Sequence, residues 1–133
     1  MQARERRTTA LDALPRIVDL LEGVVERAPN LDHAGANRVL ALVYLRAPGW
    51  PAGPGDPEKA LDQARLAIER APDYPPNQLC FAEALAAGGE NVAAAEVYRG
   101  ALRSAGKWAG SGHREAREWL EEAEVGLAGL GAD

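Results

Sequence analysis

The residues that could carry chemistry in this chain are one cysteine, Cys80, and two histidines, His33 and His113. A nucleophile needs a base within hydrogen-bonding reach, so a catalytic pair would have to join Cys80, Ser104 or Ser111 to one of these histidines. Cys80 lies in the apolar stretch of an expected helix, where free cysteine packs as a small hydrophobe. A buried, inert thiol is the favoured interpretation, and we expect the protein not to be an enzyme.

Neither a metal site nor a phosphate-binding loop is expected. One cysteine and two histidines far apart in the sequence lack the spacing of metal ligands. Gly106-Lys107 resembles the end of a phosphate loop, but the preceding glycine is at the wrong distance and no Ser or Thr follows. The acidic residues between 115 and 124 are interpreted as the solvated face of a helix. The sequence therefore predicts no metal and no cofactor.

Composition narrows the class of protein. At 133 residues the chain has room for one domain, and its excess of Ala and Leu over aromatic residues suits packed helices better than a sheet. The net charge of -5 has the wrong sign for binding nucleic acid. No apolar run approaches the length of a membrane span, and we expect a cytoplasmic protein, or a periplasmic one if a targeting segment has been removed.

Two sets of apolar residues recur along the chain and predict a repeat of helix pairs. The first set has a period of 34: Ala60, Ala64 and Ala67 are followed by Ala94, Tyr98 and Ala101. The second set has a period of 41: Leu40, Ala41 and Tyr44 are followed by Phe81, Ala82 and Leu85. The longer period indicates an insertion of seven residues between the two helices of the first pair, where the Pro/Gly-rich segment 47–56 predicts a stiff, extended loop.

These patterns predict an all-α fold with six helices, at 9–28, 34–46, 56–71, 75–87, 91–105 and 113–129. The organisation follows as a flexible tail at 1–8, a half-repeat helix at 9–32, repeats at 34–72 and 75–106, and a capping helix at 113–129. Thr9 and Asp12 resemble a capping box at the start of the first helix. The segment GKWAGSG is expected to be the loop before the last helix.

The spacings are similar to those of the tetratricopeptide (TPR) repeat, which implies an antiparallel helix-pair solenoid. In that family a small residue fits where two helices cross and a proline closes the pair. The resemblance assigns the crossing positions to Ala41 and Ala82, their partners to Ala60 and Ala94, and the closing proline to Pro72. Gly106 takes the place of this proline in the second repeat, and the usual tryptophan early in the first helix is absent.

A narrower resemblance rests on RVLALVYLRAPGWPAGPGDPEKALDQARLAIERAPDYPPN, with its Pro/Gly loop inside a repeat. This string is similar to the helical T component associated with TRAP-type transporters and to related bacterial repeat proteins. That likeness implies a binding protein for a solute or a partner, and a homo-oligomer.

The residues expected to face a ligand or partner come from the first helices of the two repeats and from the inserted loop: Arg38, Leu42, Leu45, Arg46, Trp50, Leu79 and Glu83. Trp50 and Trp108 are expected in loops, where folding back over the core is favoured over waiting for a ligand because burying an aromatic ring stabilises by about 2 to 3 kcal/mol. Trp119 is expected to pack beside the apolar face of the last helix.

Two functions remain open at this point. The first is a scaffold module that binds a protein or peptide on a concave face and the Trp50 loop. The second is a small-molecule binder in which this loop and Arg38 or Arg46 close a pocket over an anionic solute. A pocket that joins the arginines to Trp50 would favour the second, and a shallow open groove would favour the first.

Overall fold

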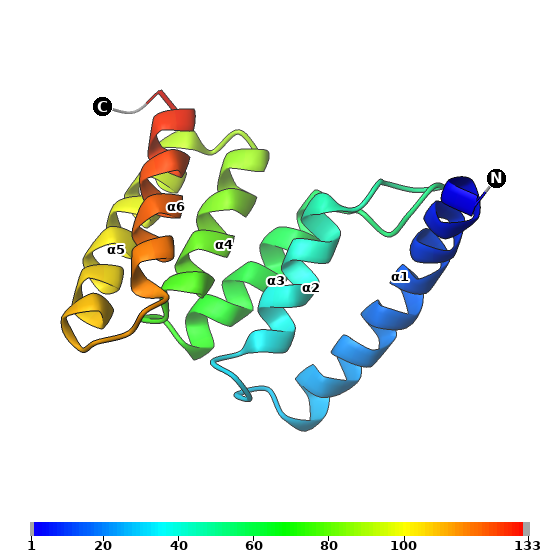
Figure 1. Cartoon of the computed structure of the whole chain (residues 1–133), viewed down its shortest axis with the longest axis horizontal. Coiled ribbons are helices and arrows are strands. Elements are labelled where there is room, and N and C mark those ends of the chain that lie inside the picture. The colour runs from blue at the N-terminus through cyan, green and yellow to red at the C-terminus, as the bar shows by residue number, and fades with distance from the viewer. Residues whose placement is uncertain (1, 132–133) are drawn as a thin grey trace.

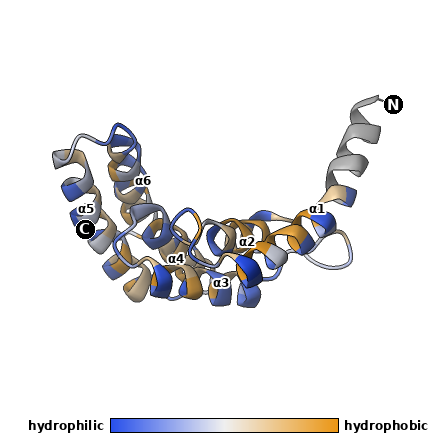
Figure 2. Ribbon diagram, turned by 90° about the horizontal axis from the view of Figure 1, so that it is seen from below, coloured by the Kyte–Doolittle hydropathy of each residue, from blue (hydrophilic) through white to orange (hydrophobic). Residues whose placement is uncertain are grey.

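The computed structural model describes the backbone of residues 2–131 and the side chains of residues 12–131. Over this range the chain is all-helical, as predicted, with six helices: α1 (Gln2–Arg27), α2 (Gly35–Arg46), α3 (Pro57–Arg70), α4 (Pro75–Ala87), α5 (Asn91–Gly110) and α6 (Ala116–Gly129). Each helix packs against the next in sequence, and α4 also contacts both α2 and α6. Figures 1 and 2 show the result, a curved array with α1 at one end and α5 and α6 at the other.

Two equivalent backbone hydrogen bonds close the two helix pairs. The amide of Asp56 donates to the carbonyl of Tyr44 over 2.8 Å, and the amide of Glu90 donates to that of Leu85 over 2.9 Å. The shorter period relates Asp56 to Glu90, and the longer period relates Tyr44 to Leu85. The two pairs therefore close at equivalent positions, in the register that the apolar pattern indicates, and the inserted residues lie in the connection 47–56.

Local signals explain where the helices of the first pair begin and end. Asp56 accepts hydrogen bonds at its carboxylate from the amides of Glu58 and Lys59, each over 3.1 Å, and Pro57 occupies the first turn of α3. α3 ends at Arg70, because Pro72 cannot continue the helical hydrogen bonding.

The core is a chain of three apolar clusters along the array, each joining consecutive helices. The first joins α1, α2 and α3 through Val18, Leu40, Tyr44 and Ala60. The second joins α2, α3 and α4 through Ala41, Ala64, Cys80 and Ala84. The third joins α4, α5 and α6 through Leu79, Ala82, Tyr98, Ala101 and Ala123. Small side chains at these contacts let the helix backbones approach closely.

The repeat positions named from the sequence are buried apart from Pro72 and the half-buried Phe81, but the crossing alanines pair differently from the expectation. Ala41, Ala60, Ala82 and Ala94 are all fully buried. However, Ala41 shares its cluster with Ala64 rather than Ala60, and Ala82 shares its cluster with Tyr98 rather than Ala94. Ala67 and Ala101 are also fully buried, whereas Pro72 is exposed.

Three helix boundaries differ from the prediction by more than one residue. α1 begins at Gln2. The expected tail at 1–8 and the expected helix start at Thr9 are therefore wrong for the described backbone. Residues 2–14 contain no glycine or proline that would interrupt a helix. The side chain of Thr9, and with it the proposed capping box, lies outside the described side chains. α5 continues to Gly110, so Trp108 is helical, because the glycines in GKWAGSG cost helix stability without removing a hydrogen-bond donor as proline does. α6 begins at Ala116 instead of 113.

The inserted segment 47–56 is a closed loop, so the prediction of an extended one is wrong. The amide of Gly55 donates to Pro48 over 2.8 Å, and Gly49 and Gly55 form an isolated bridge. Glycine is required at position 55, because a Cβ there would collide with the carbonyl oxygen of Ala47. The two ends of the loop are held together, and its tip carries Trp50.

The connection between α1 and α2 has an unusual backbone. Asp32, His33 and Ala34 all have positive φ angles, of 52°, 52° and 62°. Residues other than glycine rarely adopt this left-handed conformation, so neighbouring structure must hold the segment in place. The buried side chain of Asn77 does so by donating from Nδ2 to the carbonyl of His33 over 2.8 Å.

Candidate binding groove

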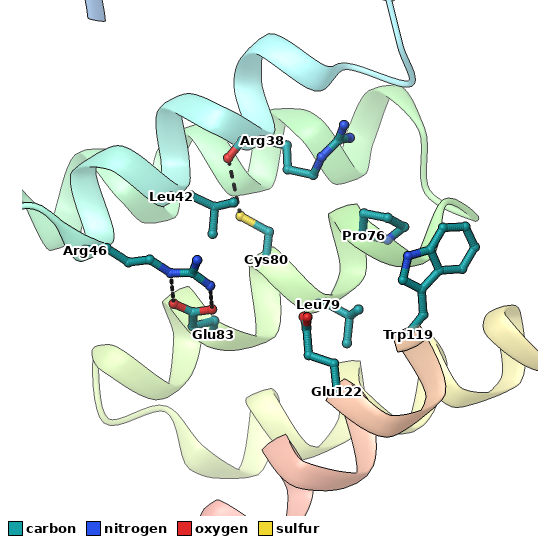
Figure 3. Close-up of a pocket in the computed structure, with 9 residues that line it drawn as sticks. All are labelled: Arg38, Leu42, Arg46, Pro76, Leu79, Cys80, Glu83, Trp119 and Glu122. Carbon is teal, nitrogen blue, oxygen red and sulfur yellow. Dashed lines mark hydrogen bonds and ion pairs between the residues drawn. The ribbon is translucent and has the colours of Figure 1, made fainter. Parts of the chain in front are cut away.

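A groove runs across the first helices of the two pairs and across α6. Its volume is about 220 Å³, and its lining comes from three helices: Arg38, Leu42 and Arg46 of α2, Pro76, Leu79, Cys80 and Glu83 of α4, and Trp119 and Glu122 of α6. Figure 3 shows these side chains converging from the three helices. The groove thus brings together five of the seven residues expected to face a ligand or partner.

An ion pair bridges the groove at one end. The guanidinium of Arg46 donates from Nη2 to Glu83 Oε1 over 2.7 Å and from Nε to Oε2 over 3.1 Å. This two-point contact joins α2 to α4, and the hydrogen bonding of the guanidinium to Glu83 raises the pKa of Arg46. Because the side chain of Arg46 is 61% exposed, the pair fixes orientation more than it adds stability.

The second arginine, Arg38, is held by structural contacts. Its Nη1 donates to Asn77 Oδ1 over 2.8 Å, and its Nη2 lies 3.3 Å from Asp32 Oδ2. The guanidinium also lies over the ring of Tyr74, 5.2 Å from the centroid. Arg38 and Arg46 therefore both have partners of their own, which leaves neither as an uncompensated positive charge.

Cys80 forms part of the groove floor but is only 3% exposed. Burial, and secondarily the carboxylate of Glu83, raises the pKa of its thiol to about 12. Its Sγ donates a weak hydrogen bond to the carbonyl of Arg38 over 3.8 Å. At neutral pH the sulfur is therefore a protonated packing group and a poor nucleophile.

The carboxyl of Glu122 faces the groove from α6 (Figure 3). Partial burial raises its pKa, and the negative charge of Glu83 raises it further, while Arg46 acts in the opposite direction. Two arginines and two glutamates line the groove, so its formal charges sum to zero when all are ionised. The apolar wall is formed by Leu42, Leu79 and Trp119, which suits a neutral, amphipathic occupant better than a highly charged one.

A group of aromatic side chains, His33, Tyr74, Trp108, His113 and Trp119, gathers next to the groove; we call it the aromatic cluster. His33 stacks on Tyr74 at 4.1 Å between centroids, and Trp108 lies edge-on to the other four at 4.4 to 6.0 Å. Trp108 Nε1 donates to the carbonyl of Asp73 over 3.1 Å. The cluster joins the connections before α2, α4 and α6, and thereby sets the spacing of the three helices that line the groove.

Two of the expected residues lie elsewhere. Leu45 packs on the cluster formed by α1, α2 and α3. Trp50 is 89% exposed, so the expectation that it folds back is wrong; the closed loop holds its ring away from the core. It lines a separate pocket of about 310 Å³ between the loop and α1. Trp50 and the two arginines therefore line different pockets.

Pro76, Trp119 and Glu122 were not predicted to line the groove, and neither was Cys80. The last helix is interpreted from the sequence as a cap in preference to an oligomer seam, although Ala41, Ala82 and Ala123 follow one another at equal intervals and are all fully buried. Continuing the repeat to α6 would have placed this helix beside α4. Part of the aromatic cluster also has a signal, because His33 and Tyr74 are separated by the longer period of 41 residues and Tyr74 and Trp108 by the shorter period of 34. His113 and Trp119 follow neither period.

Within the described residues, no three or more His, Cys, Asp or Glu side chains are grouped as metal ligands. No helix there has both the length and the apolar character needed to cross a bilayer. Comparison with known proteins finds no matching family model and no matching curated protein.

Proposed function

We propose that this chain is a non-catalytic TPR-type binding module, whose groove across α2, α4 and α6 receives a segment of a partner protein. The observation that carries the proposal is the groove itself, with an apolar wall, balanced charges and side chains from three helices. Clefts of this kind bury apolar side chains of a ligand while a few polar groups fix its orientation. The repeat spacing and the buried alanines support the TPR assignment.

The charges favour a protein segment over the second candidate, an anionic solute. A pocket for an anion needs a positive group whose charge is not already neutralised. Arg46 is bound at two points by Glu83, and Arg38 is bound by Asn77 and Asp32. An amphipathic segment can use the apolar wall without displacing these contacts.

Site-specific photo-crosslinking tests the proposal. A benzoylphenylalanine at Glu122, in the groove, is compared with one at Glu96, an exposed position of α5, in lysate of the source cells. We expect a discrete protein adduct from position 122 only. The double reversal Arg46→Glu with Glu83→Arg, which keeps an ion pair but inverts its direction, should reduce this adduct.

Two results would contradict the proposal. Equal adducts from positions 122 and 96 would show that the groove is not the binding surface. A retained anionic small molecule, seen by native mass spectrometry of gently purified protein and lost in the reversed variant, would establish the solute-binding alternative.

A further inference from the structure

The side of α1 that faces away from α2 carries uncovered apolar side chains. Leu20 is 71% exposed and Ile17 is 39% exposed, whereas Val18, which packs on α2, is 8% exposed. Ala13 and Val24 are half-buried and lie on the same face, because residues spaced by three and four positions align along a helix. We call these four residues, Ala13, Ile17, Leu20 and Val24, the α1 edge.

The internal repeat indicates what kind of element would cover the α1 edge. The matching strings ERAPN and ERAPD align α1 with α3, so that Ile17 corresponds to Ala60 and Leu20 to Gln63. Ala60 is fully buried in a cluster supplied largely by α2, and Gln63 accepts a hydrogen bond from Asn37 of α2. The α1 edge is thus the surface that a helix placed like α2 would cover.

Val39 gives independent support for a missing neighbour. Its counterpart is Cys80, by the same shift that relates α2 to α4. Cys80 is 3% exposed because α2 covers it, whereas Val39 is 41% exposed. The positions on α1 and on α2 that a preceding helix would bury are therefore both uncovered.

The other end of the array is different. The outward face of α6 carries the exposed residues Arg117, Glu118, Glu121 and Glu124, with Val125 among them. Burying these charges against an apolar helix edge would cost free energy without providing partners. Head-to-tail stacking of α6 on α1 of another copy is therefore unfavourable, and the occupant must present an apolar edge of its own.

We propose that the α1 edge binds the α1 edge of a second copy of this chain, antiparallel about a two-fold axis. Its spacings of four, three and four residues are those of a coiled-coil seam. Antiparallel pairing places Ile17 against Leu20 of the second copy and Val24 against Ala13. The edge is thus complementary to itself, as a two-fold interface requires.

The flanking charges fit the same register. Arg16 comes near Gly23 of the second copy, where an added Cβ would meet no atom within 4 Å, so space is available for the guanidinium. Arg27 comes near Asp12 of the second copy. Both Asp12 and Arg27 are exposed, and neither has an ion-pair partner among the described side chains. The pairing therefore joins opposite charges at both ends of the seam.

Sedimentation equilibrium of the full chain from about 1 to 200 μM tests the interface, in a range where a modest seam should associate. We expect the wild type to approach the mass of two chains. Leu20→Glu should weaken association at least about 10-fold, because it places two charges in the apolar seam. Val125→Glu is the matched control, since Val125 is also 71% exposed but lies on α6, and it should leave association unchanged.

A charge exchange tests the antiparallel register. Arg27→Asp and Asp12→Arg should each weaken association about 3- to 10-fold, because each creates two like-charge pairs per dimer. An equimolar mixture should recover wild-type association, because both contacts in the mixed dimer then join opposite charges. A wild type that stays a single chain at the highest concentration, an effect of Val125→Glu equal to that of Leu20→Glu, or a mixture without recovery would overturn the proposal.

Discussion

Asn37 and Asn77 are the polar side chains that the described core buries completely. Asn77 donates to the carbonyls of His33, Ala67 and Ala71 and accepts from Arg38. It thereby satisfies carbonyl groups at the end of α3 and in the left-handed connection before α2. Because this buried amide has four partners, it holds the end of α3 and the connection before α2 in place, and no single hydrogen bond accounts for its contribution to stability.

We expect Asn77→Ala to lower the free energy of unfolding by about 2 to 4 kcal/mol, because it removes buried hydrogen bonds to three carbonyl groups and a partner of Arg38. Urea denaturation followed by circular dichroism measures the change. Asn91→Ala, at an exposed position of α5, should change stability by less than about 0.5 kcal/mol. Equal effects of the two substitutions would show that the contacts of Asn77 add little.

Cys80 should react with Ellman's reagent at least about 100-fold more slowly in the folded protein than in guanidinium at pH 8, because burial disfavours the thiolate.

The burial of Cys80 should also make the stability of the protein depend on pH. The folded pKa, about 12, lies above the ordinary value of 9.0, so the contribution of the protonated thiol is complete below pH 9 and declines as the pH rises toward 12. The stability of the wild type should therefore fall relative to Cys80→Ala between pH 8 and 10. A rapid reaction of the folded protein, or no relative fall, would contradict the buried environment.

At the scale of the helices, the length of α5 depends on a glycine at the position where the first pair has a proline. Pro72 follows the end of α3, whereas Gly106 stands at the equivalent position of the second pair and α5 continues through it to Gly110. The extra turns carry Trp108 into the aromatic cluster. The second helix pair is thereby attached to the connection before α4.

Gly106→Ala should stabilise the protein by up to about 1 kcal/mol, because a Cβ there meets no atom within 4 Å and alanine favours the helix. Gly106→Pro should destabilise it by about 3 kcal/mol or more and reduce the near-ultraviolet circular dichroism of Trp108, because it breaks α5 before the cluster. Thermal unfolding and near-ultraviolet spectra measure both effects. Similar stability of the two variants would show that the end of α5 is not needed.

The packing of α6 on α5 depends on another glycine. A Cβ at Gly126 would collide with the ring of Tyr98, whereas a Cβ at Gly129 would meet no atom within 4 Å. Gly126→Ala should destabilise by about 1 to 3 kcal/mol through overpacking, while Gly129→Ala should be neutral or stabilising. Denaturant unfolding of the two variants compares the same substitution on the same helix, and a neutral result for Gly126→Ala would contradict the packing.

Across the whole molecule, the helices differ in how many neighbouring helices they contact. Among the described residues, α1 makes helix contacts only with α2, whereas α4 contacts α2, α3, α5 and α6. Figure 2 shows the array curving from α1 to the pair α5 and α6. In an array of this kind, stability is expected to fall toward an end that has a single neighbour.

Amide hydrogen exchange should therefore show the lowest protection in α1 and the highest in α3 and α4. If the α1 edge pairs with a second copy, protection of α1 should rise with protein concentration, and Leu20→Glu should abolish that rise. Exchange at about 5 and 200 μM, followed by mass spectrometry, separates the two effects. Uniform protection along the chain would contradict the unequal packing.

The sequence determined the all-helical class, the repeat register and the position of the insertion. Apolar spacing and alanine recurrence are local properties, and the equivalent bonds of Asp56 and Glu90 follow from them. Five groove residues could be placed on the right face because side chains three and four positions apart share one side of a helix.

The tertiary structure decided the remainder. The sequence did not place α6 beside α4, gather the aromatic cluster from four separate segments, or close the loop that leaves Trp50 exposed. These features depend on contacts between residues far apart in the chain, whose geometry is fixed only when the helices pack. For the same reason, the uncovered α1 edge became evident only once α2 was seen to occupy one side of α1 alone.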